Sequence, residues 1–523
     1  MISFGTDGWR GIIADDFTLE NVRIVSQAVC DYVNAEKQKA KGKEQRAKSK
    51  NKYSSTEGAD NNKYSSTDSD RSVGGVEKLH SHPYEQRTPT LIIGYDTRFL
   101  SDKFAREAAC VAAGNGIKVL LTDSFAPTPT VSYAVVDHKT DGAIMFTASH
   151  NPYRYNGLKF KAPYGGSATP GITAEIEHHL EKNVRAKKKP TVMDFDKAVT
   201  RSVIQFFDPK EPYLQELARL VDVKLLNNSA TTVVVDPMYG SGQDYLSGFL
   251  KDAGCNVKEI HGRRDPYFGG VNPEPFLPNL DELKETVTGQ YSLGLALDGD
   301  ADRIGAIDKS GEFINSHMIF SLLLKYLYEE KGLSGDVVKT VSTTSMIDKL
   351  AASYGLTLIE TPIGFKYICD KMLEGDVLIG GEESGGIGIK NHIPERDGML
   401  MGALLVEMMN FYGKTLLELW NELQATFGRF CLDRIDIEVD GAAREKVLAF
   451  LSAWQPKEIA GSAVTSVNSS DGYKYYLANG AWLMVRSSGT EAVVRIYVEA
   501  DKKQLVRELL TKGQDIVTSA GQS

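Results

Sequence analysis

The sequence predicts an α/β protein: three mixed-sheet α/β domains of similar topology, then a C-terminal α+β domain, arranged around a central cleft. Two observations carry this prediction. Short apolar runs alternate with helical patterns over most of the chain, which is typical of βαβ units. Four of these runs also end in a small, polar loop, and the loops are spaced along the chain as if each domain contributed one.

Residues 1–204 are expected to form the first domain. "LIIGYD", "SDKFAREAACVAAGNG" and "IKVLLTD" predict strand, helix and strand in succession. Residues 36–90 separate a helix expected at about 19–37 from the strand at 90–96, and they contain "NKYSST" twice. Because such a polar segment buries too little apolar surface to offset its ordering entropy, we expect a solvated, mobile insertion. Its first part, "EKQKAKGKEQRAKSKNK", is basic, so a tether for a partner or an anionic surface is the alternative.

Three further domains are expected at residues 205–310, 311–428 and 429–523. The first two continue the alternation of strands and helices, for example through "DVVKTVST", "SMIDKLAASYG" and "LTLIETP". The last changes character: "DRIDIEV", "YKYYLANG" and "AWLMVRSSG" predict antiparallel strands, and "KKQLVRELLTKGQDIV" predicts a closing helix. Since open α/β sheets bind ligands beyond the carboxyl ends of their strands, the four loops are the expected site.

Composition narrows the class of protein. Of 523 residues, 42% are hydrophobic and 25% charged, as in ordinary globular proteins, and the net charge of −9 argues against a general nucleic-acid binder. Five cysteines without a CxxC pair indicate neither a disulfide framework nor a zinc cage. The sequence does not begin with a basic region followed by an apolar run, so we expect no signal peptide, and it contains no apolar run of about 18 residues, the length of a membrane span. We therefore expect a cytoplasmic protein without a membrane or nucleic-acid partner; the sequence makes no prediction of oligomeric state.

"DGDADR" places Asp298, Asp300 and Asp302 at alternate positions directly after "LGLAL". An extended loop can turn three such carboxylates toward one point, and hard oxygen ligands suit Mg²⁺. A calcium EF-hand would need Gly and Glu where this chain has Arg303 and Lys309. The remaining alternative is a solvated acidic turn, in which the three carboxylates would repel one another without a cation. The pattern therefore predicts a magnesium site.

Ser149, in "MFTASHNPYRYNGLKF", has two interpretations. Either Ser149 or Asn151 caps a helix, or Ser149 takes part in catalysis. A serine hydroxyl needs a base or a metal to activate it, and His150 and Lys159 are the nearby candidates. A phosphorylated Ser149 would instead carry the reacting group and bring negative charge to a metal.

"RSSGTE" and "GGEESGG" are candidate substrate loops. In the first, glycine lets backbone amides approach an anion, hydroxyls donate to it and Arg486 adds a bidentate fork; an ordinary polar turn is the alternative. The second sets carboxylate and hydroxyl groups between glycine pairs, which suits the hydroxyls of a sugar; an ordinary Gly-rich acidic turn is the alternative. The chain has no GxxxxGK[ST] motif, so a Walker-type nucleotide site is not indicated.

Together and in this order, "TASHNPYRYNGLKF", "DGDADR", "GGEESGG" and "RSSGTE" resemble the signatures of the α-D-phosphohexomutase superfamily. "FGTDGWRG" and "TPIGFKYI" resemble two further motifs of that superfamily, and the likeness is to its phosphoglucomutase and phosphomannomutase branch. It covers nearly the whole chain apart from residues 36–90. The resemblance implies that Ser149 is phosphorylated and that its phosphate joins Asp298, Asp300 and Asp302 around Mg²⁺.

The resemblance also implies roles for the other candidate residues. Arg10 and His150 would lie near the transferring phosphoryl group, and Lys159 would be a general base or acid. Arg303 would help to position the phosphoserine and the substrate. Glu382 and Ser384 would bind the sugar hydroxyls, with Lys366 beside them. The phosphate that is not reacting would be held by Arg486, Ser488, Gly489 and Thr490.

The reaction that the resemblance implies is an intramolecular phosphotransfer. Glucose 1-phosphate and glucose 6-phosphate would interconvert through a phosphoserine enzyme, with glucose 1,6-bisphosphate as intermediate and activator. The alternatives are a phosphomannomutase or dual-specificity mutase, a phosphoglucosamine mutase, a Mg²⁺-dependent phosphatase and a non-catalytic phosphosugar-binding protein. The C-terminal domain is expected to move as a hinged body over the cleft.

Overall fold

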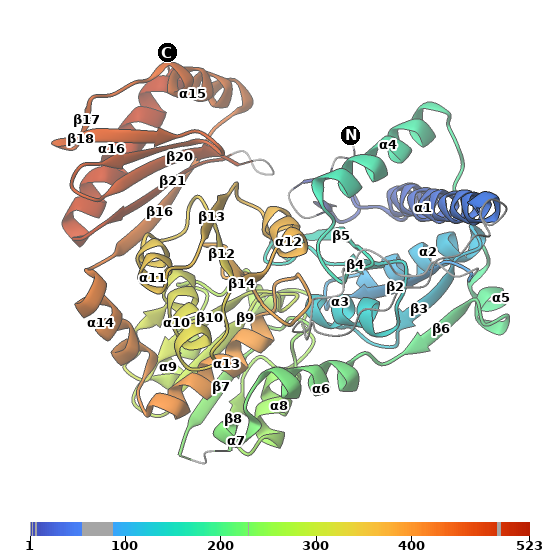
Figure 1. Ribbon diagram of the computed structural model, residues 1–523, viewed down its shortest axis with the longest axis horizontal. Helices are drawn as coiled ribbons and strands as arrows, with labels where there is room; N and C mark the ends of the chain where they lie inside the picture. Colours follow the sequence, from blue (N-terminus) through green and yellow to red (C-terminus); the bar gives the residue numbers. More distant parts are fainter. Residues whose placement is uncertain are drawn as a thin grey trace, which may run out of the picture.

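The structure is a computed structural model of the chain, and it describes residues 2, 4–5, 8–54, 87–227, 230–488 and 493–522. Figure 1 shows four sheets following one another along the sequence, each with helices packed beside it. The predicted fold class is confirmed. Among the described residues, no helix is long and apolar enough to cross a membrane.

Five of the six described strands of the first sheet run in one direction, and the second strand in the order across the sheet runs antiparallel to both of its neighbours. Across the sheet the order is β1 (Trp9–Ile12), β5 (Tyr155–Lys161), β4 (Ala143–Phe146), β2 (Thr90–Tyr95), β3 (Lys118–Thr122) and β6 (Ile204–Phe207). The helices of this region are α1 (Leu19–Ser54), α2 (Ser101–Gly114), α3 (Thr128–Asp137), α4 (Pro170–Arg185) and α5 (Phe195–Thr200). β4 is buried along its whole length, as expected of a strand covered on both faces.

The second and third sheets are smaller. The second has the order β11 (Phe313–Ile314), β10 (Ile304–Asp308), β9 (Leu293–Leu297), β7 (Thr232–Asp236) and β8 (Asn256–Glu259), and the third β13 (Leu358–Thr361), β12 (Asp336–Thr340), β14 (Val377–Gly381) and β15 (Ile387–Ile389). Their helices are α6 (Lys210–Leu220), α7 (Val223–Leu226), α8 (Leu246–Asp252), η1 (Phe268–Gly270), α9 (Asp281–Val287), α10 (Ser316–Glu329), α11 (Met346–Tyr354), α12 (Phe365–Glu374), α13 (Gly398–Tyr412) and α14 (Leu416–Phe427).

One arrangement of four strands occurs in all three of these sheets. The first strand in sequence (β2, β7 or β12) lies between two parallel partners, and a fourth strand (β5, β10 or β15) returns antiparallel beside the third. The turn between the third and fourth strands therefore has the same place in each domain. These three turns are residues 147–154, 298–303 and 382–386, which are three of the four motif loops.

The C-terminal sheet is antiparallel throughout. Its order is β16 (Cys431–Glu438), β21 (Val493–Ala500), β20 (Trp482–Ser487), β19 (Tyr473–Leu477), β18 (Ser462–Asn468) and β17 (Glu458–Ile459). α15 (Gly441–Ala453) and α16 (Lys503–Gln522) pack on it, as Figure 1 shows. The predicted antiparallel strands and closing helix are confirmed, and the fourth motif loop joins β20 to β21.

The apolar cores show which parts pack as units. One cluster runs from Tyr213 to Leu423 and is shared by the second and third sheets, whereas the first and C-terminal sheets have clusters of their own. A small cluster that includes Val341 and Trp482 joins the C-terminal sheet to the third. The domain divisions after residues 204, 310 and 428 stay predictions. β6 of the first sheet continues past residue 204, and β11 of the second sheet lies a few residues beyond 310.

The expected end of the first helix near residue 37 is wrong. α1 continues to Ser54, into the segment that we expected to be a solvated insertion. The reason is that Lys, Glu, Gln, Arg and Ala have high helix propensity, so a lack of apolar residues does not by itself end a helix. Residues 55–86 of the predicted insertion lie outside the described part of the chain.

The two ends of this insertion lie close together. Lys37 Nζ is 3.9 Å from Asp141 Oδ1, and Arg87 NH1 is 3.3 Å from Asp141 Oδ2. We expect that replacing residues 41–86 by a short Gly/Ser linker changes the melting temperature by less than about 3 °C, because loop closure depends only slowly on length. Calorimetry and turnover of the implied reaction check this. Insoluble or inactive protein would show that the segment packs against the body.

His261 connects two carboxylates of the second domain. Its Nδ1 lies 2.9 Å from Asp236 Oδ1 at the end of β7, and its Nε2 lies 3.0 Å from Glu282 Oε2 on α9. The hydrogen bond and charge of Asp236 raise the pKa of His261 from 6.5 to about 9. Because the folded-state pKa is the higher one, the imidazolium stabilises the fold fully below pH 6.5, and this contribution is lost as the pH rises through about 9.

We therefore expect His261→Gln to lower the free energy of unfolding by about 2 kcal/mol near pH 6 and by little above pH 9.5, allowing for the partial exposure of the ring. Urea unfolding of the wild-type and variant proteins at both pH values is the measurement. Equal losses at the two values would mean that the charge of His261 does not stabilise the fold.

Candidate active site

Ser149 lies in the loop that leads from β4 into the strand β5. The interpretation that Ser149 or Asn151 caps a helix is therefore wrong. Ser149 is buried, its φ is 53°, and its N–H donates to Thr147 Oγ1 over 2.9 Å. A residue other than glycine in this left-handed region is strained, and such strain persists only where the surroundings impose it.

Arg98, which the sequence motifs did not indicate, imposes the shape of this loop. It is fully buried and forms an ion pair with Asp96 at 3.1 Å. Its guanidinium donates to the carbonyl oxygens of Ser149 (2.5 Å), Asn151 (2.7 Å), Pro152 (3.0 Å) and Tyr155 (3.0 Å). The one sequence signal was its place just after the buried strand β2, where functional side chains collect.

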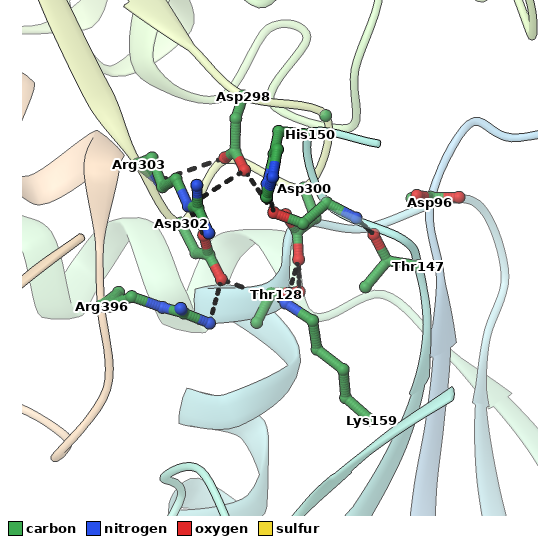
Figure 2. A network of polar contacts seen from close by, with 12 residues as sticks. Asp96, Thr128, Thr147, His150, Lys159, Asp298, Asp300, Asp302, Arg303 and Arg396 are labelled. Carbon is green, nitrogen blue, oxygen red and sulfur yellow. Dashed lines mark hydrogen bonds and ion pairs between the residues drawn. The ribbon is translucent and has the colours of Figure 1, made fainter. Parts of the chain in front are cut away.

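Asp298, Asp300 and Asp302 form a buried cluster directly after β9. One carboxylate oxygen from each lies within 4.8 Å of the others, and Figure 2 shows the three side chains converging. Asp300 Oδ1 and Asp302 Oδ1 are buried without a hydrogen-bond partner among the described residues. Because buried carboxylate oxygens are unfavourable unless paired, and three hard oxygen donors suit Mg²⁺, these residues fit a divalent cation.

The electrostatics of the cluster agree with this interpretation. Burial, together with the charges of Asp300 and Asp302, raises the pKa of Asp298 well above its ordinary value. Burial also opposes ionisation of Asp300, but the neighbouring Lys159 ammonium outweighs it and holds the pKa of Asp300 below its ordinary value. Like charges held this close repel one another, and a cation among them would relieve that repulsion.

The first domain supplies three side chains to this cluster. Ser149 Oγ donates to Asp298 Oδ2 over 2.7 Å. Lys159 Nζ, from β5, donates to Asp300 Oδ2 over 2.9 Å and to Asp302 Oδ2 over 3.2 Å. Thr128 Oγ1, at the start of α3, donates to Asp300 Oδ2 over 2.6 Å. Ser149, Lys159 and the three aspartates are thus brought together as predicted, whereas sequence reasoning missed Thr128.

His150 and Arg10 flank Ser149. His150 Nδ1 lies 3.4 Å from Ser149 Oγ, and Arg10 donates through NH1 to Asn151 Oδ1. Burial, followed by the nearby positive charges of Arg303, Arg10 and other arginines, lowers the pKa of His150 well below its ordinary value. The imidazole is therefore neutral at neutral pH and can exchange hydrogen bonds without adding charge.

The loop after β14 carries the predicted sugar-binding residues. Glu382 is buried and faces Arg396, a residue that the sequence did not single out. Arg303 Nε, in the loop after β9, lies 3.9 Å from Asp298 Oδ2. The backbone of Arg303 forms a β-bridge with Gly386 of the loop after β14. The Ser384 hydroxyl is buried without a hydrogen-bond partner in the described part of the chain. Lys366 stands on the first turn of α12, with Nζ 5.3 Å from the Tyr367 ring.

Arg486 and Ser488 are the candidate residues of the C-terminal motif that the structure describes. Arg486 Nε donates to Asp471 Oδ1 over 2.8 Å, and the buried Ser488 donates its N–H to Val493 O over 2.9 Å. Burial acts to raise the pKa of Glu383, but a hydrogen bond from Ser342 and the charge of Arg486 outweigh burial and hold this pKa below its ordinary value. Arg486 therefore acts across the boundary between two domains. Gly489 and Thr490 lie outside the described residues.

Known proteins share this organisation. Family models match in chain order: the phosphoglucomutase/phosphomannomutase α/β/α domain I at residues 73–187, domain II at 211–311, domain III at 315–427 and the C-terminal domain at 438–512. A phosphoglucomutase/phosphomannomutase of Thermococcus kodakarensis is 31% identical over 435 residues, 83% of this chain and 90% of that protein.

A phosphoglucosamine mutase of Methanococcus maripaludis is 29% identical over 431 residues, 82% of this chain and 91% of its own. Among solved structures, a Thermus thermophilus protein described as a phosphomannomutase is 31% identical. It has a TM-score of 0.77 and covers 99% of both chains. The fold and the order of the domains are thus shared over the whole chain, whereas the names of these relatives span several sugars.

Proposed function

Because this chain belongs to the phosphoglucomutase/phosphomannomutase family and is therefore a phosphohexose mutase, we propose that it interconverts glucose 1-phosphate and glucose 6-phosphate through phosphorylated Ser149. The observation that carries this proposal is the Ser149 hydroxyl, 2.7 Å from Asp298 at the edge of the buried carboxylate cluster. A serine placed there can carry a phosphoryl group at the point where three carboxylates would hold a divalent cation.

Asp298, Asp300, Asp302 and a phosphate oxygen on Ser149 would hold Mg²⁺, which when bound would offset negative charge on the transferring phosphoryl group. The free hydroxyl of a hexose monophosphate attacks the phosphorus of phosphorylated Ser149. The bond from phosphorus to Oγ breaks, the sugar hydroxyl gives up its proton, and Ser149 Oγ takes one up. Lys159 is the proposed acid or base for these proton transfers.

The second half of the reaction returns the other phosphate to Ser149. The hexose 1,6-bisphosphate first has to turn around, so that its C1 and C6 phosphates exchange places. Glu382, Ser384 and Lys366 are the proposed partners of the sugar hydroxyls. Arg486, Ser488, Gly489 and Thr490 are the proposed partners of the phosphate that is not reacting. A phosphate site on a separate domain can accept either phosphate, which the exchange requires.

We expect Arg486→Ala to raise KM for the hexose phosphate by about tenfold or more and to change kcat by less than about threefold, because a charge-assisted hydrogen bond contributes roughly 1.5–3 kcal/mol. Steady-state kinetics measure both constants. Arg507→Ala, an exposed arginine on α16 of the same domain, is the matched control. An unchanged KM for Arg486→Ala would place the phosphate elsewhere.

The choice of glucose over other sugars is tested by direct competition. We expect the highest kcat/KM for glucose 1-phosphate when it is assayed beside mannose 1-phosphate and glucosamine 1-phosphate, with Mg²⁺ and a trace of the matching bisphosphate. A higher kcat/KM for mannose 1-phosphate or glucosamine 1-phosphate would identify that sugar phosphate, instead of glucose 1-phosphate, as the substrate. Release of inorganic phosphate without isomerisation would favour the phosphatase alternative, and binding without turnover the phosphosugar-binding alternative.

A further inference from the structure

Arg396 connects two loops of the site. It lies between β15 and α13 and is 3% exposed. Its NH2 is 2.7 Å from Asp302 Oδ2 in the carboxylate cluster, and its NH1 is 3.4 Å from Glu382 Oε2 in the sugar-binding loop. Figure 2 shows the guanidinium directed at Asp302. We propose that Arg396 is a positioning residue that sets the Asp302 carboxylate for the cation; this inference rests on the proposed function of Asp302 and Glu382.

The contacts of Arg396 separate the two oxygens of Asp302. Oδ2 faces Arg396 NH2 at 2.7 Å and Lys159 Nζ at 3.2 Å, whereas Oδ1 accepts no hydrogen bond from the described residues and lies 3.8 Å from Arg303 Nε, beyond hydrogen-bond distance. Asp300 shows the same division, with Oδ2 held by Lys159 and Oδ1 left without such a bond. A carboxylate whose one oxygen is held by protein cations presents the other as a ligand in a fixed direction.

The sugar-binding loop is shaped around this arginine. A Cβ atom at Gly386 would lie 2.2 Å from Arg396 Cδ and 2.8 Å from its Cγ, so only glycine leaves room for the side chain. The same Cβ would lie 3.2 Å from Glu382 Oε2. One glycine of "GGEESGG" is thereby explained by the path of Arg396. The positions of Glu382 and Asp302 are linked through a single side chain.

The first domain fixes the segment that carries Arg396. The fully buried Lys161 donates to Glu395 Oε2 over 2.6 Å, and Ser167 Oγ donates to both Glu395 oxygens over 3.0 and 3.1 Å. The Arg396 N–H donates in turn to Glu395 Oε1 over 3.1 Å. Lys159 and Lys161 share one face of β5 because side chains alternate along a strand. One strand therefore supports the carboxylate cluster directly, and also indirectly through Glu395 and Arg396.

Binding of Mn²⁺ to the full-length protein without sugar tests this inference separately from catalysis. We expect Arg396→Met to weaken Mn²⁺ binding, measured by titration calorimetry or electron paramagnetic resonance, by about 10- to 100-fold, as is typical when the partner of a metal ligand is removed. KM for the hexose phosphate should rise as well, because Glu382 loses a contact. The Mn²⁺ affinity of Arg396→Lys should lie between those of Arg396→Met and wild type, since lysine keeps the positive charge but cannot contact Asp302 and Glu382 with separate nitrogens.

Lys339→Met is the matched control. Lys339 is a buried cation of the third domain that pairs with Asp348 and, at 3.8 Å, with Glu360, away from the carboxylate cluster. Its loss should lower the melting temperature and leave Mn²⁺ affinity unchanged. The proposal is overturned if Arg396→Met keeps Mn²⁺ affinity within about twofold of wild type.

If Arg396→Met does not fold, Arg396→Lys decides, and wild-type affinity in that variant overturns the proposal. Wild-type protein that binds no Mn²⁺ would refute the metal site of the proposed function. If the wild type binds Mn²⁺ and the Arg396 variants bind it equally well, only the role of Arg396 is refuted.

Discussion

Ser149→Ala should lower mutase turnover by at least about 10⁴-fold, the scale on which loss of a catalytic nucleophile acts. Alanine lacks the hydroxyl that lies 2.7 Å from Asp298 Oδ2 and that carries the phosphoryl group in the proposed reaction. The fold should survive, because alanine removes a single oxygen and leaves the four carbonyl contacts of Arg98 in place. Steady-state kinetics and circular dichroism of the purified variant are the measurements.

Ser132→Ala is the control for this variant. Ser132 is a buried serine of the same domain, on α3, and its hydroxyl has no hydrogen-bond partner within the described ranges. It should therefore retain wild-type turnover. Activity near wild type in Ser149→Ala would remove this serine from the reaction and, with it, the phosphoserine mechanism.

Asp300→Asn should have the second largest effect, a loss of about 10³-fold or more in kcat at moderate Mg²⁺. The amide keeps the size of the side chain but removes one of three negative charges, and Lys159 loses its closest carboxylate partner. Raising the Mg²⁺ concentration should recover part of the activity, because the remaining ligands would bind the cation more weakly. Removal of divalent cations with EDTA should abolish wild-type activity, and added Mg²⁺ should restore it.

A Mg²⁺ titration of wild type, Asp300→Asn and Asp252→Asn measures this effect. Asp252 is an exposed aspartate at the end of α8, so its variant controls for the change of net charge. Wild-type Mg²⁺ dependence in Asp300→Asn would contradict the assignment of the carboxylate cluster as the metal site. The control Asp252→Asn, in contrast, should keep the Mg²⁺ dependence of the wild type.

Local patterns were enough to predict the fold class. Apolar strand runs such as "LIIGYD" and "LGLAL" became β2 and β9, and the antiparallel C-terminal strands formed as expected. The expected end of α1 is wrong, because a lack of apolar residues does not end a helix where helix propensity favours its continuation. The threefold repeat of one strand arrangement was expected only in outline, since the order of strands in a sheet depends on pairing between distant segments.

The candidate site divides in the same way. Ser149 and the three aspartates lie in compact motifs whose residue types indicate their chemistry. Arg98, Thr128 and Arg396 are single polar residues in segments without a motif, and they act across long separations: 51 residues from Arg98 to Ser149 and 172 from Thr128 to Asp300. Such contacts follow from how distant segments pack within a domain and between domains, which the local sequence does not specify.

Phosphate transfer through Ser149 is the central claim, and mapping the label from ³²P-labelled glucose 1,6-bisphosphate tests it most directly. The purified enzyme is incubated with the bisphosphate and Mg²⁺, the labelled peptide is identified by mass spectrometry, and unlabelled glucose 1-phosphate is then added. We predict one phosphate on Ser149 and its loss to the sugar on that addition. Label on another residue, or continued turnover by an enzyme whose Ser149 is never phosphorylated, would contradict the account.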